Sequence, residues 1–402
     1  MKPIKIDQKR IDEIFARGTV VEVLPSKDAL MAKLLAGEKI KIYIGFDATS
    51  SALHLAHARI LIFLEELRQL GHEVIVLFGD FTAQIGDPTD KGTARKQLTH
   101  EDVKKNVASW IKQVTPLINL DDPKNPTHIK YNSEWLSKLS FADVVGLASN
   151  FTVQQMLERD MFQKRIKENT PIYLHEFLYP LMQGYDSVAM DVDAEVCGTD
   201  QIFNAMAGRT LLKRLKDKEK FVIALNLMEN PKTGALMSKS KGTGVFIDQS
   251  ADQLFGSIMA QPDEMIEPFF MNCTRIPLDQ KSEILGKGPR IAKAIIAKDI
   301  VKRFHGEAAA ISAEQAFEAT FAKGGVPEDV LEIKLGAGAS PVALVEALIK
   351  VGIVPSKTEW RRLVKDGAVK NEKDEKITDP NFIPSETVVL KVGKRRFVKI
   401  VI

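Results

Sequence analysis

Short apolar runs with the composition of β-strands recur along the first 225 residues and alternate with stretches of helical periodicity. The runs are Lys41–Phe46, Glu73–Phe78, His128–Tyr131, Ala194–Cys197 and Phe221–Leu225. Because strands joined through helices pair in parallel, this order predicts a doubly wound α/β sheet of the Rossmann-like, nucleotide-binding type. Ligands of such sheets bind beyond the carboxyl ends of the strands. The sequence has no G-x-G-x-x-G after the first strand and no Walker phosphate loop, which argues against a dehydrogenase or a P-loop enzyme.

The first strand runs into a polar turn and then a helix start that carries two histidines. Apolar residues follow helical spacing over 53–70, and Ser50 or Ser51 is expected to cap this helix. The positive end of the helix would then face the turn and favour a polyphosphate. His54 and His57 share one helix face, so both rings can donate to phosphate or ribose oxygens. A histidine pair of this kind, taken alone, is more often a surface or capping feature.

A second loop, at 231–244, is rich in glycine, lysine and hydroxyl residues and contains Met-Ser-Lys-Ser at 237–240. Taken alone it reads as a solvated loop. Together, His-Leu-Ala-His at 54–57 and this loop resemble the two signature motifs of class I aminoacyl-tRNA synthetases. The segments 81–88, 151–162, 179–186 and 198–204 resemble the bacterial tyrosyl-tRNA synthetases, so the resemblance spans most of the chain.

The resemblance implies a set of substrate-binding residues for tyrosine. Tyr43 would donate to the phenolic oxygen and Asp186 would accept the phenolic proton. The residues implied at the amino and carboxylate groups are Tyr179, Gln183 and Asp87 for the ammonium, with Asp47 close by, and Gln201 near the carboxylate. Tyr179, Gln183 and Asp186 are spaced by four and three, so one helix face can present all three to a single pocket.

The same resemblance implies ATP as the second substrate. It places Thr49 and His54 on the outer phosphate, His57 near the ribose, Asp200 on the ribose hydroxyls and Lys239 on the departing pyrophosphate. Mg²⁺ is expected to arrive with ATP and to be held by phosphates and water, with no protein-bound metal. Two positions depart from the family pattern: Ala56 replaces a glycine of the first motif, and Leu236 replaces the first lysine of the second.

The chain has 402 residues, enough for several domains. We expect the following division: a catalytic domain with an N-terminal helical extension at 1–225, a signature loop at 226–249, a helical domain on the anticodon side at 250–325, a linker at 326–340 and an RNA-binding α+β domain at 341–402. The last segment has 13 Lys and Arg against 8 Asp and Glu, a net +5 in a chain of +3.

Within this basic segment, the pattern of residues 356–371 predicts a helix, a glycine turn and a strand. This stretch resembles a small RNA-binding module. Arg361, Arg362, Lys365 and Lys370 would contact RNA phosphates. A run of charges is usually only a solvated face. RNA binding is favoured here because the basic residues are concentrated in one domain of a chain that resembles a tRNA synthetase.

The resemblance implies a tyrosine–tRNA ligase that forms tyrosyl-adenylate and transfers tyrosine to the 3′ end of tRNA(Tyr). The family resemblance implies a homodimer. An N-terminus without an apolar core and two isolated cysteines favour a cytoplasmic protein with no membrane partner. The alternatives are an adenylyl transferase that uses the histidine pair on another small metabolite, and a non-catalytic RNA-binding protein on a synthetase scaffold.

Overall fold

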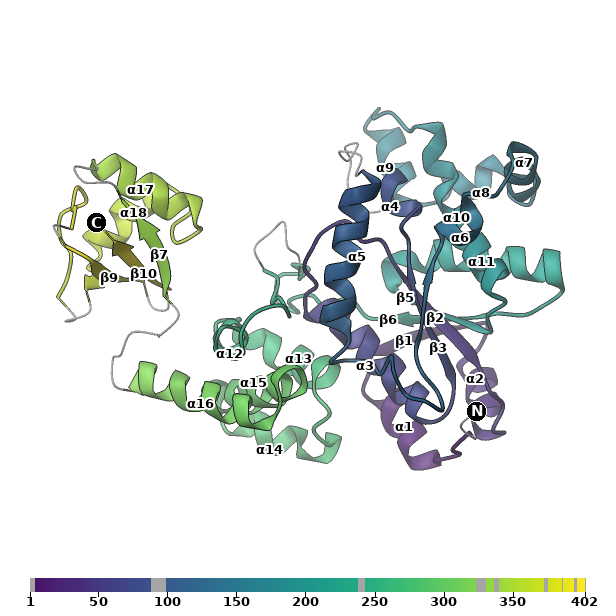
Figure 1. Cartoon of the computed structure of the whole chain (residues 1–402), viewed down its shortest axis with the longest axis horizontal. Coiled ribbons are helices and arrows are strands. Elements are labelled where there is room, and N and C mark those ends of the chain that lie inside the picture. Colours follow the sequence, from purple (N-terminus) through teal and green to yellow (C-terminus); the bar gives the residue numbers. More distant parts are fainter. Residues whose placement is uncertain are drawn as a thin grey trace. The chain divides into compact units, whose positions relative to one another are not determined.

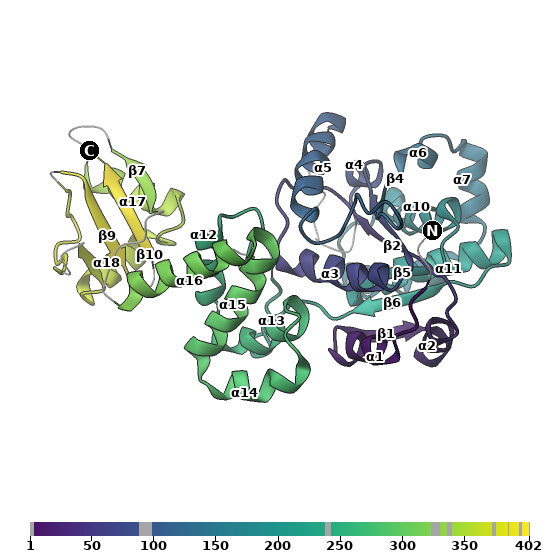
Figure 2. The same ribbon diagram turned by 60° about the horizontal axis from the view of Figure 1, so that its bottom comes forward.

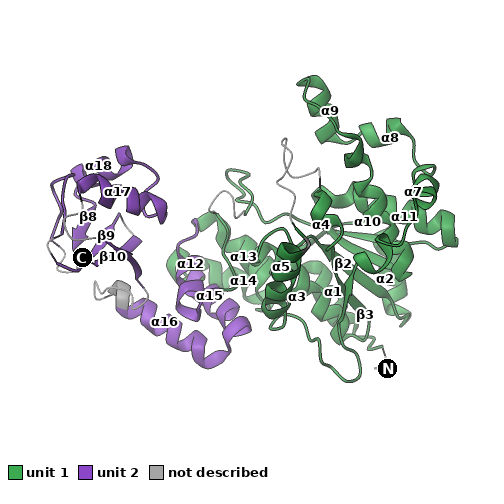
Figure 3. Cartoon of the chain, turned by 45° about the horizontal axis from the view of Figure 1, so that its top comes forward, with its two compact units in different colours: residues 1–248, 263–292 green, residues 249–262, 293–402 purple. Residues whose placement is uncertain are grey.

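A computed structural model describes residues 4–87, 99–237, 243–322, 330–335, 340–371, 375–384, 386–393 and 396–401. The chain divides into two compact units, one of residues 1–248 with 263–292 and one of residues 249–262 with 293–402 (Figure 3).

The first unit is built on a six-stranded sheet. Its strands are β1 (Val20–Leu24), β2 (Lys41–Phe46), β3 (Glu73–Phe78), β4 (His128–Tyr131), β5 (Ala194–Gly198) and β6 (Phe221–Leu225), in the spatial order β1-β6-β5-β2-β3-β4. The last five strands pair in parallel, which confirms the predicted α/β class and the five predicted runs. The strand order reverses between β2 and β5, and a crevice at such a switch point is where this class of sheet binds ligands.

Strand β1 was not predicted from the sequence. It pairs antiparallel with β6, so the sheet is mixed at this edge. Its central residues, Val21 and Glu22, are exposed, so β1 lacks the continuous apolar run by which the inner strands were recognised. Helix α2 (Lys27–Leu35) lies close to β1, at the edge seen best in Figure 2.

Helices cover the sheet and lead away from its strands (Figure 1). Those nearest the crevice are α3 (Leu55–Gln69), α4 (Thr82–Ile85), α5 (His100–Val114), α10 (Tyr179–Met190) and α11 (Ile202–Lys216). The other helices of this unit are α1 (Gln8–Ala16), α6 (Ser133–Leu136), α7 (Phe141–Ala148), α8 (Val153–Leu157), α9 (Asp160–Lys167), α13 (Ile266–Cys273), α14 (Lys281–Gly286) and the 3₁₀ turns at Leu174–Phe177, Thr199–Gln201, Asp263–Met265 and Leu278–Gln280.

The start of α3 differs from the prediction that Ser50 or Ser51 caps it. His54 is the N-cap residue, and its backbone N–H donates to Nδ1 of His57, 3.3 Å away. The backbone N–H of Leu55 also donates to the carbonyl of Val245 at 2.9 Å. A tertiary contact with the segment after the second signature therefore holds the residues before the helix extended, and the cap moves to the first histidine.

The region 250–325 is helical as expected, but it does not form one separate body. Helices α13 and α14 belong to the first unit, because Arg17 donates to the carbonyls of Phe270 and Ile276, and Arg275 forms an ion pair with Glu66 of α3. The second unit contains α12 (Ala251–Met259), α16 (Glu307–Ala322) and most of α15 (Pro289–His305). The helices of 250–325 are therefore divided between the two units.

The C-terminal part of the second unit is a four-stranded sheet with two helices. Its elements are β7 (Leu331–Lys334), α17 (Pro341–Lys350), α18 (Lys357–Lys365), β8 (Val369–Asn371), β9 (Val388–Val392) and β10 (Arg396–Val401), with strand order β7-β10-β9-β8. The helix, glycine turn and strand predicted for 356–371 are present as α18, Gly367 at φ +64° and β8.

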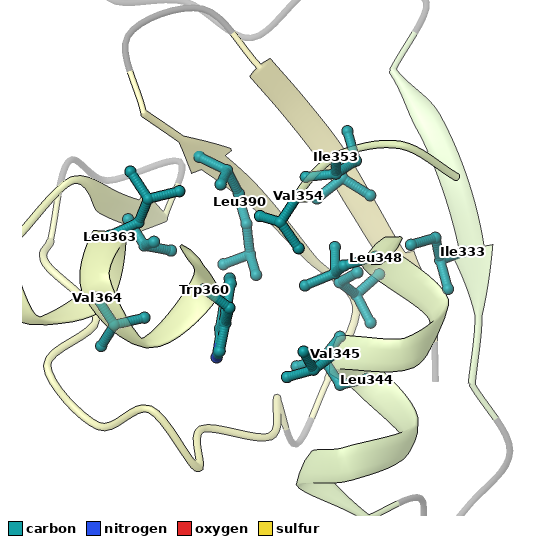
Figure 4. Packing of buried hydrophobic residues seen from close by; sticks show 14 of the residues in the cluster. Ile333, Leu344, Val345, Leu348, Ile353, Val354, Trp360, Leu363, Val364 and Leu390 are labelled. Carbon is teal, nitrogen blue, oxygen red and sulfur yellow. The ribbon is translucent and has the colours of Figure 1, made fainter. Parts of the chain in front are cut away.

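This small domain has a hydrophobic core of its own. Trp360 is buried among Leu344, Leu348, Leu363 and Leu390, as Figure 4 shows. Strand β7 pairs in parallel with β10 and adds Ile333 to that core. Part of the predicted linker at 326–340 is therefore a strand of this domain, because the short apolar and polar alternation at 330–335 needs β10 as a pairing partner to form a strand.

Candidate active site

A cavity of about 820 Å³ opens at the carboxyl ends of the parallel strands of the first unit. Ten of the described residues predicted for the site lie on its wall, from segments far apart in the sequence: Asp47, Thr49, His54, His57, Asp87, Tyr179, Gln183, Asp186, Asp200 and Gln201. Tyr43 is fully buried and is not one of the described wall residues. Lys239 lies outside the described residues.

Hydrogen-bond acceptors gather where the amino group of an amino acid is expected. Tyr179, on the first turn of α10, donates its hydroxyl proton to Oδ2 of Asp47 at 2.8 Å, and Thr82 donates to Oδ1 of the same carboxylate at 2.7 Å. Gln201 donates to Oδ2 of Asp87 at 2.7 Å. These two carboxylates on the cavity wall, from different loops, can attract an ammonium group.

Asp186 occupies a buried position on α10, with 3% of its surface exposed. Its carboxyl group accepts hydrogen bonds from Trp135 Nε1 at 2.7 Å and from Asn132 Nδ2 at 3.4 Å. Burial raises the pKa of Asp186 well above its ordinary value, and these two hydrogen bonds oppose the rise. A buried carboxyl group of this kind favours a ligand that donates a hydrogen bond to it.

The structure also places residues at the site that sequence reasoning missed. Glu195, on β5, lies on the cavity wall and accepts a hydrogen bond from Gln183 Nε2 at 2.9 Å. Behind it, Lys220 forms an ion pair with Glu195, and both side chains are almost completely buried. A charged residue inside the apolar run Ala194–Gly198 was a signal that could have been used, because a buried carboxylate needs a partner.

The two histidines of the first motif lie together at the start of α3, with ring centroids 4.0 Å apart. Burial, with a smaller effect from Arg59, lowers the pKa of His54 to about 4. Burial also lowers the pKa of His57 well below its ordinary value, with smaller effects from His54 and Arg59. Both rings are therefore neutral near pH 7 and can offer hydrogen bonds to a ligand without adding charge.

Positive charge at this end of the cavity comes from Arg59, which was not predicted. Its guanidinium is buried on the cavity wall and donates to Oδ1 of Asn226 at 2.8 Å. Burial lowers the pKa of Arg59 to about 10, which leaves it charged at neutral pH. The two departures from the family pattern, Ala56 and Leu236, lie on the same wall.

The four residues predicted to contact RNA all belong to the small C-terminal domain. Arg361, Arg362 and Lys365 are exposed on α18, and Lys370 is half-buried on β8. Arg362 donates to Glu359 and to Asp366, so its charge is partly balanced within the helix. Arg361 and Lys365 are four residues apart and share one side of α18.

Among the described residues, no group of three or more His, Cys, Asp and Glu side chains is arranged to hold a metal ion. Within the same residues, no helix combines the length and the apolar character needed to cross a membrane.

Comparison with known proteins agrees with this fold. The family model described as tRNA synthetases class I (W and Y) matches residues 35–322. A tyrosine–tRNA ligase of Carboxydothermus hydrogenoformans is 41% identical over 98% of both chains, and tyrosine–tRNA ligase 2 of Vibrio parahaemolyticus is 42% identical over 95% of this chain and 96% of its own. The protein is therefore a class I tRNA synthetase. Within that class it belongs to the family of the tyrosine–tRNA ligases.

Solved structures share the fold at lower sequence identity. A mitochondrial tyrosyl-tRNA synthetase of Aspergillus nidulans gives a TM-score of 0.65 at 21% identity, covering 78% of this chain and 94% of its own. The tyrosyl-tRNA synthetase of Archaeoglobus fulgidus, solved with L-tyrosine, gives 0.59 at 20% identity, covering 76% and 99%. These likenesses confirm the architecture predicted for the catalytic part.

Gly79 leaves room for the hydrogen bond between Asp47 and Thr82, which gives a test of the site. A Cβ atom at position 79 would overlap Asp47 Oδ1 and Thr82 Oγ1. We expect Gly79→Ala to displace Asp47 and to lower amino-acid-dependent ATP–pyrophosphate exchange by about 100-fold, as misplacement of a positioning group does.

The matched control is Gly256→Ala on α12, where an added Cβ meets nothing within 4 Å. This variant should keep full exchange activity and gain about 0.5–1 kcal/mol in unfolding free energy. Exchange by Gly79→Ala at the level of the control would show that the position of Asp47 does not matter.

Proposed function

We propose that this protein activates L-tyrosine with ATP to tyrosyl-adenylate and pyrophosphate, and then transfers tyrosine to the 3′ end of tRNA(Tyr). The observation that carries the proposal is one cavity with three kinds of group on its wall. It has a buried carboxyl at Asp186 for a phenol, carboxylates at Asp47 and Asp87 for an ammonium, and the histidine motif at the start of α3 for a nucleotide. The buried carboxyl and the pair of carboxylates suit the phenol and the ammonium group of tyrosine.

The proposed chemistry needs positioning and charge stabilisation only. The tyrosine carboxylate, placed near Gln201, attacks the α-phosphate of ATP, and pyrophosphate leaves. Thr49, His54 and His57, with the N-terminus of α3, would bind the phosphates and ribose, and Asp200 the ribose hydroxyls. Lys239 remains a predicted contact of the leaving pyrophosphate. A covalent nucleophile on the protein is not part of this route.

Two further expectations, the metal ion and the cellular compartment, follow from this proposed function. Mg²⁺ would enter with ATP, with phosphate and water oxygens as its ligands. The cytoplasm stays the expected compartment.

Replacing Asp186 tests the substrate assignment. In Asp186→Ala, the tyrosine phenol loses its buried acceptor, which costs about 1–3 kcal/mol or more, so kcat/KM for tyrosine in pyrophosphate exchange should fall at least about tenfold. The KM for ATP should change little. Asp121→Ala removes an exposed carboxylate away from the cavity and serves as the control.

The wild-type enzyme, assayed with each amino acid, separates the alternatives. Exchange that depends on tyrosine supports the proposal. Exchange that depends on another acid would favour a different adenylyl transferase, and exchange with no acid would favour the non-catalytic RNA-binding scaffold.

We further propose that the C-terminal domain binds tRNA through phosphate contacts from Arg361, Arg362, Lys365 and Lys370. Support comes from the exposed, same-side position of Arg361 and Lys365 on α18. In Arg361→Glu/Lys365→Glu, tRNA affinity should fall, and the slope of log affinity against log salt should shrink by about one for each lost contact. Pyrophosphate exchange should be unchanged.

A control of equal charge change is Lys5→Glu/Lys9→Glu, at exposed positions near the N-terminus. Equal losses of tRNA affinity in both double variants would reveal a general charge effect and would contradict a specific RNA surface on α18.

We also propose that two copies of the chain associate through an apolar face of the first unit. Large apolar side chains are exposed along 141–174: Phe141 at 85%, Val145 at 52%, Val153 at 67%, Ile166 at 50%, Tyr173 at 54% and Leu174 at 80%. So many exposed apolar side chains in one segment are typical of a protein interface. The homodimer expected from the family resemblance makes a second copy the proposed partner.

Light scattering after size exclusion tests this association. Phe141→Asp/Leu174→Asp should shift the protein from dimer to monomer, because each copy would bury two unpaired charges in the interface. Leu215→Asp, at a half-exposed apolar position on α11, should leave the dimer intact. A wild-type monomer, or a dimer that survives the double change, would disprove the assignment.

A further inference from the structure

A buried lysine connects two side chains that the proposed function assigns to tyrosine. Lys220 directly precedes β6 and has no exposed surface. Its ammonium group forms an ion pair with Glu195 and donates to Ser187 Oγ at 2.9 Å. Glu195 in turn contacts Gln183, and Ser187 contacts Tyr43. Lys220 is therefore linked to Gln183 and to Tyr43 through one intervening side chain each.

The helices around this lysine are shaped to admit it. A Cβ atom on Gly208 of α11 would lie 2.6 Å from Lys220 Nζ and 2.7 Å from Ser187 Oγ. A Cβ atom on Gly184 of α10 would lie 3.1 Å from the backbone nitrogen of Gly208. Glycine at both positions lets α10 and α11 approach closely and leaves the space that the ammonium group fills.

The first consequence concerns the amide of Gln183. Paired with an ammonium ion, Glu195 is a carboxylate, which accepts hydrogen bonds but cannot donate them. Gln183 must therefore turn its amide nitrogen toward Glu195. The structure shows this orientation, with Gln183 Nε2 donating to Glu195 Oε1 at 2.9 Å. The carbonyl oxygen of Gln183 is then left as the group that can accept a hydrogen bond from a ligand ammonium.

The second consequence concerns the hydroxyl of Tyr43. A lysine ammonium only donates, so Ser187 Oγ accepts from Lys220 and keeps one proton of its own to give. Tyr43 Oη, at 2.9 Å, is closer to Ser187 Oγ than Glu195 Oε2 is, at 3.5 Å. When Ser187 donates to Tyr43, the proton of Tyr43 points elsewhere. Burial, followed by the charges of Glu195 and Asp186, raises the pKa of Tyr43 well above its ordinary value, so that proton is present at neutral pH.

We propose that Lys220 is a positioning residue for amino acid selection. Through Glu195 it makes Gln183 present an acceptor, and through Ser187 it makes Tyr43 present a donor. This inference rests on the proposed function, because it assumes that tyrosine lies with its ammonium near Gln183 and its phenol near Tyr43 and Asp186. Lys220 itself lies behind the cavity wall and touches neither substrate.

The test uses the full-length enzyme in pyrophosphate exchange with tyrosine and with phenylalanine. In Lys220→Met, the KM for tyrosine should rise about tenfold or more, because two hydrogen bonds to the substrate lose their preferred direction. The preference for tyrosine over phenylalanine should fall by a similar factor, and the KM for ATP should stay within about twofold. The matched control is Lys218→Met, two residues away, where the lysine forms an ion pair with Asp193 near the surface.

A double variant separates positioning from folding. Lys220→Met leaves a buried carboxylate without its partner and could lower stability, which a denaturant titration would report. Lys220→Met/Glu195→Gln removes that charge and should recover the stability while keeping the raised KM for tyrosine. A double variant with wild-type selectivity would mean that Lys220 only balances charge, and would overturn the proposal.

A third variant addresses the Tyr43 branch alone. Ser187→Ala removes the hydroxyl between Lys220 and Tyr43 and leaves Gln183 and Glu195 in contact. It should lower the preference for tyrosine over phenylalanine about tenfold while kcat/KM for phenylalanine stays unchanged or rises. An unchanged preference would overturn this branch. A wild-type enzyme without tyrosine-dependent exchange would instead contradict the proposed function, so the two failures are distinguishable.

Discussion

The pairing of β2 with β5 is the constraint on which the rest of the site depends. Strand β2 pairs with β3 along its whole length, but with β5 only at Ile42 with Ala194 and Tyr43 with Glu195. Beyond these pairs the ladder ends, and the segments after β2 and β5 both line one cavity. A switch in strand order thus produces both the crevice and the closeness of the residues around it.

The last pair of that ladder also brings a carboxylate, Glu195, into the interior. Tyr43 and Glu195 lie side by side on neighbouring strands and are nearly or fully buried. A buried carboxylate destabilises the fold unless it is paired and hydrogen-bonded. Lys220 and Gln183 supply those partners, and both donate hydrogen bonds to the carboxylate. An apolar replacement could fill the same volume, but it could not direct the hydrogen bonds of the cavity wall.

At the end of the cavity assigned to the nucleotide, neutral hydrogen-bonding rings occur together with a positive charge. The sequence motifs alone did not indicate this combination. His54 and His57 are neutral near pH 7, because burial lowers the pKa of both rings. The described part of the second signature places Leu236 on the wall where the family pattern has a lysine, and Arg59 brings a buried positive charge from α3. The proposed phosphate binding at this end would therefore use Arg59 and the N-terminus of α3 as well as the two rings.

The sequence by itself determined the α/β class, five of the six strands of the main sheet, the family, and ten of the residues on the cavity wall. It could do so because strand composition and local motifs are properties of short segments, and Asp47, His54, Asp186 and Gln201 each stand inside such a motif. The tertiary structure alone decided the antiparallel edge strand β1, the cap at His54, the place of α13 and α14 in the first unit, and the strand within the expected linker. It also revealed Arg59 and the buried group of Ser187, Glu195 and Lys220. Each of these depends on partners distant in the sequence, and the direction of a hydrogen bond or the need for a counter-charge exists only once those partners have been brought together.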